Sequence, residues 1–333
     1  MSRHAKPLLS AKLRWAILTA VAIAALLSMV QITTDPPLLL GERWFVGGGW
    51  LQIILAAAVG GWLYTRMYPV STRSRWRKRT WLFFTLIFFT QLLLGLCLDP
   101  VFLLSGELHF PVPDLILGGA IYRWQIGFMP LLFLITVLLS GGAWCHQLCY
   151  FGALDAWAAR KADHVHPLDS SRRQQIRLSI LTLFIVVALS LRLFGVSALW
   201  ATVWAAGVGG LGLCVLLFGS FPRRQMIHCT LYCPLGTVVS YIKQFSPWRF
   251  RITDRCTGCL RCTDHCPYGA LTRSDIQQGK PGRSCTLCGD CLPHCPHQAL
   301  GYHFPGLKTS TAERLWLSVG VTLYVCFLML ARI

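Results

Sequence analysis

Uncharged apolar stretches of helical length alternate with short polar segments along the whole chain. A helix needs about 20 apolar residues to cross the hydrocarbon core of a bilayer. The fifth stretch has only fourteen uncharged residues between Arg177 and Arg192, so both side chains would have to extend to the membrane surface. The pattern predicts an all-α polytopic membrane protein with about seven transmembrane helices, at residues 15–32, 45–65, 80–98, 124–144, 176–196, 197–219 and 315–331.

Charged residues between the predicted spans set the expected orientation. Basic residues precede the first span and crowd residues 66–79, where no acid occurs, so the positive-inside rule predicts that both segments are cytoplasmic. Acids such as Asp35, Asp99 and Asp114 lie in the alternate connections and are expected outside. Six crossings return the chain to the inner side after the sixth span, and the seventh span leaves the C-terminus outside.

Eight cysteines near the C-terminus occur in two runs of the form Cys-x2-Cys-x2-Cys-x3-Cys-Pro. In two-cluster ferredoxins the first three cysteines of such a run bind one 4Fe-4S cluster, and the fourth binds the other. A zinc ribbon also uses Cys-x2-Cys pairs, but it has no use for the third cysteine or for the x3-Cys-Pro ending. The predicted ligand sets are Cys256, Cys259, Cys262 and Cys295 for one cluster, and Cys285, Cys288, Cys291 and Cys266 for the other.

The composition of the whole chain is that of a membrane protein, so the two cysteine runs are expected in a small domain attached to membrane helices. Hydrophobic residues make up 54 % of the chain and charged residues 13 %. A small cytoplasmic α+β ferredoxin domain is expected at 246–307, after an N-terminal hairpin (1–79) and a four-helix core (80–245), and before a C-terminal helix (308–333). The net charge of +18 follows mostly from the positive-inside bias, so no nucleic-acid partner is expected. Thiols reserved for clusters indicate a reducing compartment.

A second cysteine pattern, Cys-x3-Cys-x2-Gly, occurs at the predicted cytoplasmic ends of the fourth and sixth spans. Because both copies lie at the same predicted depth, the four thiols can meet across a helix bundle. Four convergent thiols form a soft-metal or cluster site, or a redox-active pair; the alternative is that they only pack between helices. The two copies, 84 residues apart, are Cys145, Cys149 and Gly152, then Cys229, Cys233 and Gly236.

The order of these features resembles the NapH-type membrane ferredoxins and the related YccM, NosR and CcoG proteins. The similarity covers about residues 80–307, and Cys229, Cys233 and Pro234 match the family's Cys-x3-Cys-Pro motif, whereas Tyr150 replaces the proline of the first copy. The resemblance implies a multi-pass protein of the bacterial inner membrane, so the C-terminus that the charge pattern predicts outside would lie in the periplasm. It also implies electron transfer between the quinone pool and a partner redox enzyme.

Several single residues are weaker candidates. His146 and His228 adjoin the Cys-x3-Cys motifs and are candidate ligands or proton carriers, although such histidines more often form interfacial hydrogen bonds. Glu107 and His109 share the longest predicted outer loop, where quinol oxidation would need a proton acceptor. Cysteines that stand alone in predicted spans are expected to pack between helices; these are Cys97, Cys214 and Cys326.

Three functions from different classes fit this sequence. The first is a quinol-linked electron-transfer subunit, possessing two 4Fe-4S clusters and interacting with quinol. Because the hydrocarbon core is about 30 Å thick, electrons from an outer quinol would need an intermediate carrier, and the paired cysteines are the candidates. The second is a copper reductase or maturation factor, in which Cys145, Cys149, Cys229 and Cys233 handle the metal. The third is a membrane redox sensor.

Overall fold

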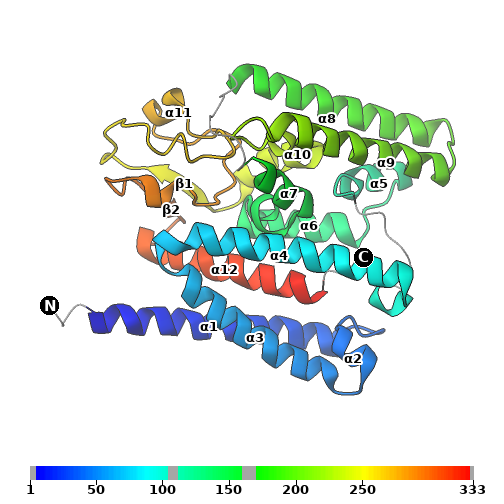
Figure 1. Cartoon of the computed structure of the whole chain (residues 1–333), viewed down its shortest axis with the longest axis horizontal. Coiled ribbons are helices and arrows are strands. Elements are labelled where there is room, and N and C mark those ends of the chain that lie inside the picture. Colours follow the sequence, from blue (N-terminus) through cyan, green and yellow to red (C-terminus); the bar gives the residue numbers. More distant parts are fainter. Residues whose placement is uncertain (1–4, 104–111, 160–169, 331–333) are drawn as a thin grey trace. The chain divides into compact units, whose positions relative to one another are not determined.

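The computed structural model describes residues 5–103, 112–159 and 170–330 and is mostly helical (Figure 1). The chain divides into two compact units. The terminal unit consists of Met1–His109 and Leu307–Ile333, and the central unit consists of Phe110–Gly306.

Five helices in the described part of the chain are long and apolar enough to cross a membrane, as expected for a multi-pass membrane protein. The predicted number of seven is not confirmed. The second predicted span forms a helix of 20 residues that is not among the five, and the fourth forms a helix of only 13 residues. The five candidate spans are Ala11–Thr33, Val70–Cys97, Ser171–Leu193, Ala198–Ser220 and Thr309–Leu330.

In the terminal unit α1 packs along α3 and α12 (Figure 1). Gly60 of α3 permits this approach, because a Cβ built there would lie 2.1 Å from Cδ1 of Ile23 in α1. The elements of this unit are α1 (Ala5–Thr33), α2 (Leu40–Trp44), α3 (Gly48–Met67), α4 (Val70–Cys97), η1 (Pro100–Phe102) and α12 (Thr309–Leu330).

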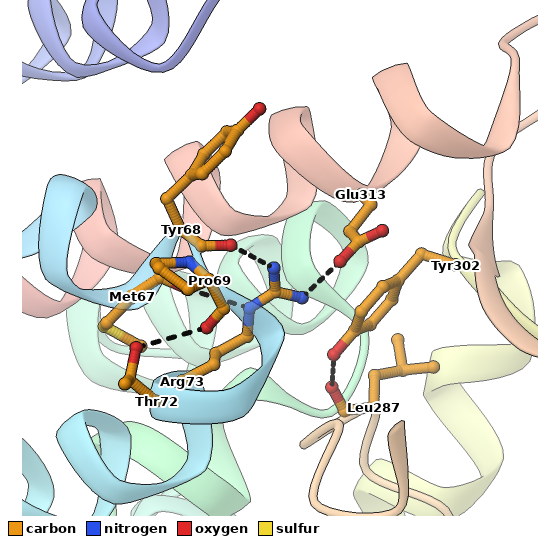
Figure 2. A network of polar contacts seen from close by, with 8 residues as sticks. All are labelled: Met67, Tyr68, Pro69, Thr72, Arg73, Leu287, Tyr302 and Glu313. Atoms are coloured by element: carbon orange, nitrogen blue, oxygen red, sulfur yellow. Dashed lines mark hydrogen bonds and ion pairs between the residues drawn. The ribbon is translucent and has the colours of Figure 1, made fainter. Parts of the chain in front are cut away.

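The basic segment 66–79 is largely helical rather than a loop, because α4 begins within it. Arg73 of α4 is 4 % exposed and donates hydrogen bonds to the carbonyl oxygens of Met67 and Tyr68 at the end of α3, both at 3.0 Å. It also forms an ion pair with Glu313 of α12, with 2.6 Å between Nη1 and Oε1 (Figure 2). A buried charge requires such partners, so Arg73 joins three helices of the terminal unit.

In the central unit α8 and α9 run side by side, with the rings of Phe184 and Trp204 5.0 Å apart (Figure 1). The shorter elements α5, η4 and α10 pack against α8, and η4 carries the second Cys-x3-Cys motif; η2, which carries the first, packs against α6 and α7. The helical elements of this unit before the ferredoxin segment are α5 (Leu115–Arg123), α6 (Phe128–Ser140), η2 (Trp144–Leu148), α7 (Tyr150–Ala158), α8 (Ser170–Leu193), α9 (Ala198–Cys214), η3 (Val215–Ser220), η4 (His228–Tyr232), α10 (Pro234–Ile242) and η5 (Lys243–Phe245).

The continuous helix predicted at 124–144 is wrong. Trp124 ends α5 with a left-handed backbone (φ 56°), α6 begins after Gly127, and Gly141 (φ 64°) ends it. At 1.5 Å per residue α6 is roughly 20 Å long, which is shorter than the hydrocarbon core. Arg177, which was expected to extend to the membrane surface, is 7 % exposed, and its Nη2 donates to the carbonyl oxygen of Gly236 at 2.9 Å. Arg192 is exposed.

The ferredoxin segment is enclosed by a two-stranded antiparallel sheet in which Arg249 pairs with His303 and Ile252 with Leu300. Both cysteine runs lie between the strands. The Tyr302 hydroxyl donates to the carbonyl oxygen of Leu287 at 2.9 Å and fixes the second run against β2 (Figure 2). The elements are β1 (Arg249–Ile252), α11 (Arg273–Gln277), η6 (Leu292–His294) and β2 (Leu300–His303).

Candidate functional site

The two cysteine runs share one unusual backbone conformation. Residues on both sides of the second cysteine adopt positive φ, and so does the third residue after the fourth cysteine. Leucine and glutamine rarely adopt this conformation, so its recurrence in both runs indicates a common curvature around each site. The angles are 71° at Gly258, 60° at Leu260 and 55° at Gly269 in the first run, and 66° at Leu287, 76° at Gly289 and 49° at Gln298 in the second.

The eight thiols gather in two groups, each lining its own cavity. The exposed quartet lines a cavity of about 10 Å³, and the buried quartet lines a cavity of about 20 Å³. Each group combines three cysteines of one run with the fourth of the other. The backbone amides of Ala270 and Ala299 donate to the sulfur of the fourth cysteine of each run at 3.3 Å, which favours the thiolate. The exposed quartet is Cys256, Cys259, Cys262 and Cys295; the buried quartet is Cys266, Cys285, Cys288 and Cys291.

The arrangement of the thiols around two cavities is the observation that bears on what they bind. Within residues 5–103, 112–159 and 170–330 no three His, Cys, Asp or Glu side chains are arranged to bind one metal ion. A 4Fe-4S cluster binds each thiolate at a different iron, so its ligands surround a cavity instead of converging on a point. The two quartets, each with three cysteines of one run and the fourth of the other, therefore fit two iron–sulfur clusters.

The two Cys-x3-Cys motifs form matching π-helical turns rather than regular α-helix ends. The amide of Cys149 donates to the carbonyl oxygen of Trp144, and the amide of Cys233 donates to that of His228, both at 2.9 Å. A new helix begins directly after each second cysteine, at Tyr150 in α7 and at Pro234 in α10. The turn therefore forms without the proline that is missing from the first copy.

These two turns bring four thiols to one cavity of about 40 Å³, larger than either ferredoxin cavity. We call these thiols the helix-end quartet. The amide of Gly236 donates to the sulfur of Cys233 at 3.2 Å, which is the same kind of contact that the ferredoxin cysteines receive. The helix-end quartet consists of Cys145, Cys149, Cys229 and Cys233.

The helix-end cavity extends from the end of a candidate span into its interior, because the Ser220 hydroxyl at that end accepts from the amides of Ile227 and His228, next to Cys229, at 2.9 and 3.3 Å. Gly209 of α9 lines the cavity, and the Tyr232 hydroxyl donates to the carbonyl oxygen of Val208 at 2.8 Å. The candidate span continues for 11 residues beyond Gly209, to Ser220, which is roughly 16 Å at 1.5 Å per residue. The cavity that the thiols line therefore runs along this part of the candidate span.

Charged side chains surround this cavity. Arg177 and Lys243 line it, and two buried acids contact its motifs. Oδ1 of Asp114 accepts from the Leu235 amide at 3.3 Å and from the Cys233 sulfur at 3.6 Å, and Oδ2 of Asp155 accepts from the Cys229 amide at 2.9 Å. Burial raises the pKa of both carboxyls above the ordinary value and lowers the pKa of Lys243 to about 8.

Sequence reasoning misplaced or missed these charges. Asp114 was expected in an outer connection, but it lines the cavity together with Cys145 because α5 and α6 form a hairpin whose two ends lie there. Asp155 was not singled out, although it is the sole acid between Asp114 and Asp163. An isolated acid in a long apolar stretch is a signal that could have found it.

The candidate histidines differ in position. His146 and His228 are buried, and each donates through Nδ1 to a glycine carbonyl oxygen, at 2.9 and 3.1 Å. Of these two, His228 lines the helix-end cavity. His265 and His294 line one ferredoxin cavity each and stack with ring centroids 3.3 Å apart. Glu107 and His109 lie outside the described residues.

The three isolated cysteines differ in burial. Cys326 in α12 is buried, as a packing role requires. Cys97 and Cys214 are exposed at the ends of α4 and α9. The expectation that all three pack between helices is therefore wrong for two of them.

Comparison with family models finds two iron–sulfur domains. Residues 255–300 match a 4Fe-4S dicluster domain, which contains both cysteine runs. Residues 122–173 match a 4Fe-4S binding domain, which contains Cys145 and Cys149. No curated protein and no solved structure matches the chain. The chain therefore has two 4Fe-4S ferredoxin-type domains, which indicate an iron–sulfur electron-transfer role, whereas the resemblance to the NapH-type family stays a prediction.

Close backbone contact holds the ferredoxin segment against the helices of the central unit, and Gly142 tests its importance. A Cβ at Gly142 would lie 2.7 Å from Cα and from the carbonyl oxygen of Thr286, which is next to Cys285. We expect Gly142→Ala to cost about 1–3 kcal/mol of stability and to lower the iron content. Thermal unfolding in detergent and iron analysis measure both. In the control Gly210→Ala, nothing lies within 4 Å of the added Cβ; equal behaviour of the two variants would contradict the expectation.

Proposed function

We propose that this protein relays electrons between the quinone pool and a partner redox protein, through iron–sulfur centres at a membrane. The observation that carries this proposal is the third group of thiols. The helix-end quartet lies in the same compact unit as the two ferredoxin quartets, and its cavity is lined in part by Val208 and Gly209 of α9. This position supports a role as carrier between a membrane donor and the ferredoxin; a quinol bound near the cytoplasmic face would remove the need for one.

The exposed and buried quartets would each hold one 4Fe-4S cluster, which supplies one-electron chemistry when bound. The residues of this chain shape the two sites. Left-handed residues such as Leu260 and Leu287 curve the loops, and the amides of Ala270 and Ala299 direct hydrogen bonds at sulfur. Oxidation of one quinol to quinone releases two electrons and two protons, which matches the capacity of two one-electron centres.

We infer that the helix-end quartet holds a polynuclear metal centre rather than a disulfide. A disulfide is neutral, whereas thiolates on a metal carry negative charge that needs compensation. Arg177 and Lys243 line the cavity and supply positive charge, while burial raises the pKa of Asp114 and Asp155 and favours their neutral forms. The overlap of residues 122–173 with a 4Fe-4S binding domain supports iron and sulfide as the content.

The copper-handling alternative has less support. A copper site needs ligands that converge on one ion, and the described residues offer no such group. A redox sensor would use the same centres without steady electron flow, and nothing in the site favours it over a relay.

We further propose that the N-terminus and the ferredoxin domain are cytoplasmic and that the C-terminus is periplasmic, in a bacterial inner membrane. Contacts within the terminal unit support this orientation. Thr19 contacts Ser318 near the start of α12, and Gln52 contacts Met329 near its end, so α1 and α12 run parallel and α3 runs antiparallel. The starts of α1, α4 and α12 therefore share one end of the unit, where basic residues concentrate, and the ferredoxin segment leads directly into α12.

Metal content tests the cluster assignment. Anaerobically purified protein should contain about eight iron and eight acid-labile sulfide from the ferredoxin alone. Cys266→Ser should impair the cluster of the buried quartet, although it alters the first run. Cys326→Ser, at a buried cysteine outside the three quartets, should leave the content unchanged. Iron and sulfide assays with electron paramagnetic resonance measure this, and zinc in place of iron would refute the assignment.

Reporter fusions test the orientation. A fusion after Leu307 should be active only with a cytoplasmic reporter, and a fusion after Ile333 only with a periplasmic one, because the basic end of the terminal unit should stay inside. A fusion after Lys78 serves as the cytoplasmic control. A cytoplasmic C-terminus would show that α12 does not cross the membrane as proposed.

Paired cysteine variants test the helix-end quartet. If its thiols hold one centre, then Cys145→Ser with Cys149→Ser, or Cys229→Ser with Cys233→Ser, should each stop quinol-driven reduction of the ferredoxin. Combining both pairs should add no further loss. Dithionite should still reduce both ferredoxin clusters, and Cys214→Ser is the matched control. Stopped-flow bleaching measures the rate, and a wild-type rate in either double variant would remove the quartet from the mechanism.

A further inference from the structure

The helix-end cavity adjoins one of the two ferredoxin sites. Tyr268, Cys285 and Thr286 line both the helix-end cavity and the cavity of the buried quartet. The cavity of the exposed quartet has no lining residue in common with the helix-end cavity. The Tyr268 hydroxyl also donates to the carbonyl oxygen of Cys145 at 3.2 Å. Of the two ferredoxin sites, the buried quartet therefore adjoins the helix-end cavity, and the exposed quartet does not.

Lys243 lies next to Cys285, one of the residues that line both cavities. It is the first residue of η5 and is partly buried. Its ammonium group donates hydrogen bonds to the carbonyl oxygens of Arg283 and Cys285, in the loop that opens the second cysteine run. Lys243 also lines the helix-end cavity, so one positive charge faces the thiols of Cys145 and Cys285.

Lys243 reaches the buried quartet through the carbonyl oxygen of Cys285, whereas the lining of the exposed quartet's cavity contains His294 and His297 but no lysine or arginine. Arg255 and Arg261 adjoin its cysteines in sequence, but both are exposed, where solvent and salt screen their charge. A cluster bound by four thiolates is negative and becomes more negative on reduction. A cation held close to it in less polar surroundings stabilises the reduced form and raises the reduction potential.

We propose that Lys243 raises the reduction potential of the cluster held by the buried quartet above that of the exposed quartet. The site that adjoins the helix-end quartet would then be the one reduced first. Lys243 acts on the cluster through its charge and does not bind the metal. This inference rests on the proposed function, because it requires that the quartets hold clusters.

The test is a redox titration of the full-length protein, followed by electron paramagnetic resonance. In the wild type the two clusters should show separate midpoint potentials, and the signal altered by Cys266→Ser identifies the buried quartet. Lys243→Met should lower the midpoint of that signal and leave the other in place. Lys243→Arg keeps the charge and should leave both midpoints near the wild-type values.

Two further variants separate charge from packing. Lys243→Gln keeps a donor without the charge and should reproduce the shift of Lys243→Met. Lys280→Met removes an exposed lysine of the same domain and should shift neither midpoint. Unchanged midpoints in Lys243→Met, equal shifts of both clusters, or loss of a cluster in both neutral variants would overturn the role of Lys243. Absence of iron from the wild type would instead overturn the proposed function.

Discussion

A charged side chain in apolar surroundings needs a partner, and this requirement organises both units of the protein. In the terminal unit Arg73 satisfies two carbonyl oxygens at the end of α3 and pairs with Glu313 of α12. In the central unit Arg177 of α8 bonds to α10, and Asp155 of α7 accepts from the amide of Cys229 in η4. Each charge therefore connects helices that are distant in sequence, and the charges of the central unit are concentrated around thiols.

Close backbone approach is the second requirement, because hydrogen bonds and thiols can meet only where side chains leave room. Gly142 lies against the backbone of Thr286, and Gly141 lies near Leu287, so the end of α6 contacts the second cysteine run directly. The indole nitrogen of Trp248 donates to the carbonyl oxygen of Leu139 at 2.7 Å and strengthens the same contact. Sequence patterns alone assigned these two glycines no function. The structure shows that they permit the close contact between the end of α6 and the second cysteine run.

The sequence predicts well where chemistry depends on local spacing and poorly where it depends on packing. The cysteine runs could be interpreted from their intervals, because each loop is short enough that its spacing fixes its curvature. The hairpin of α5 and α6 could not be predicted, because apolar residues 124–144 suit one long helix as well as two short ones. The breaks at Trp124 and Gly141 depend on backbone conformation, which hydropathy does not report. Asp114 was misplaced for the same reason, since its partner Cys233 is 119 residues away.

The unequal exposure of the two ferredoxin quartets gives the proposed relay a direction in space. Cys266, Cys288 and Cys291 are buried, and their site shares a wall with the helix-end cavity. Cys259 of the other quartet is exposed, although Cys262 is buried, and the proposed relay would use that site for contact with a soluble partner. A ferredoxin with two equivalent faces would offer a partner either cluster. Here one side of the ferredoxin segment packs against the helices of the central unit, and in the proposed relay the site that adjoins the helix-end cavity would be the one to receive electrons from a membrane donor.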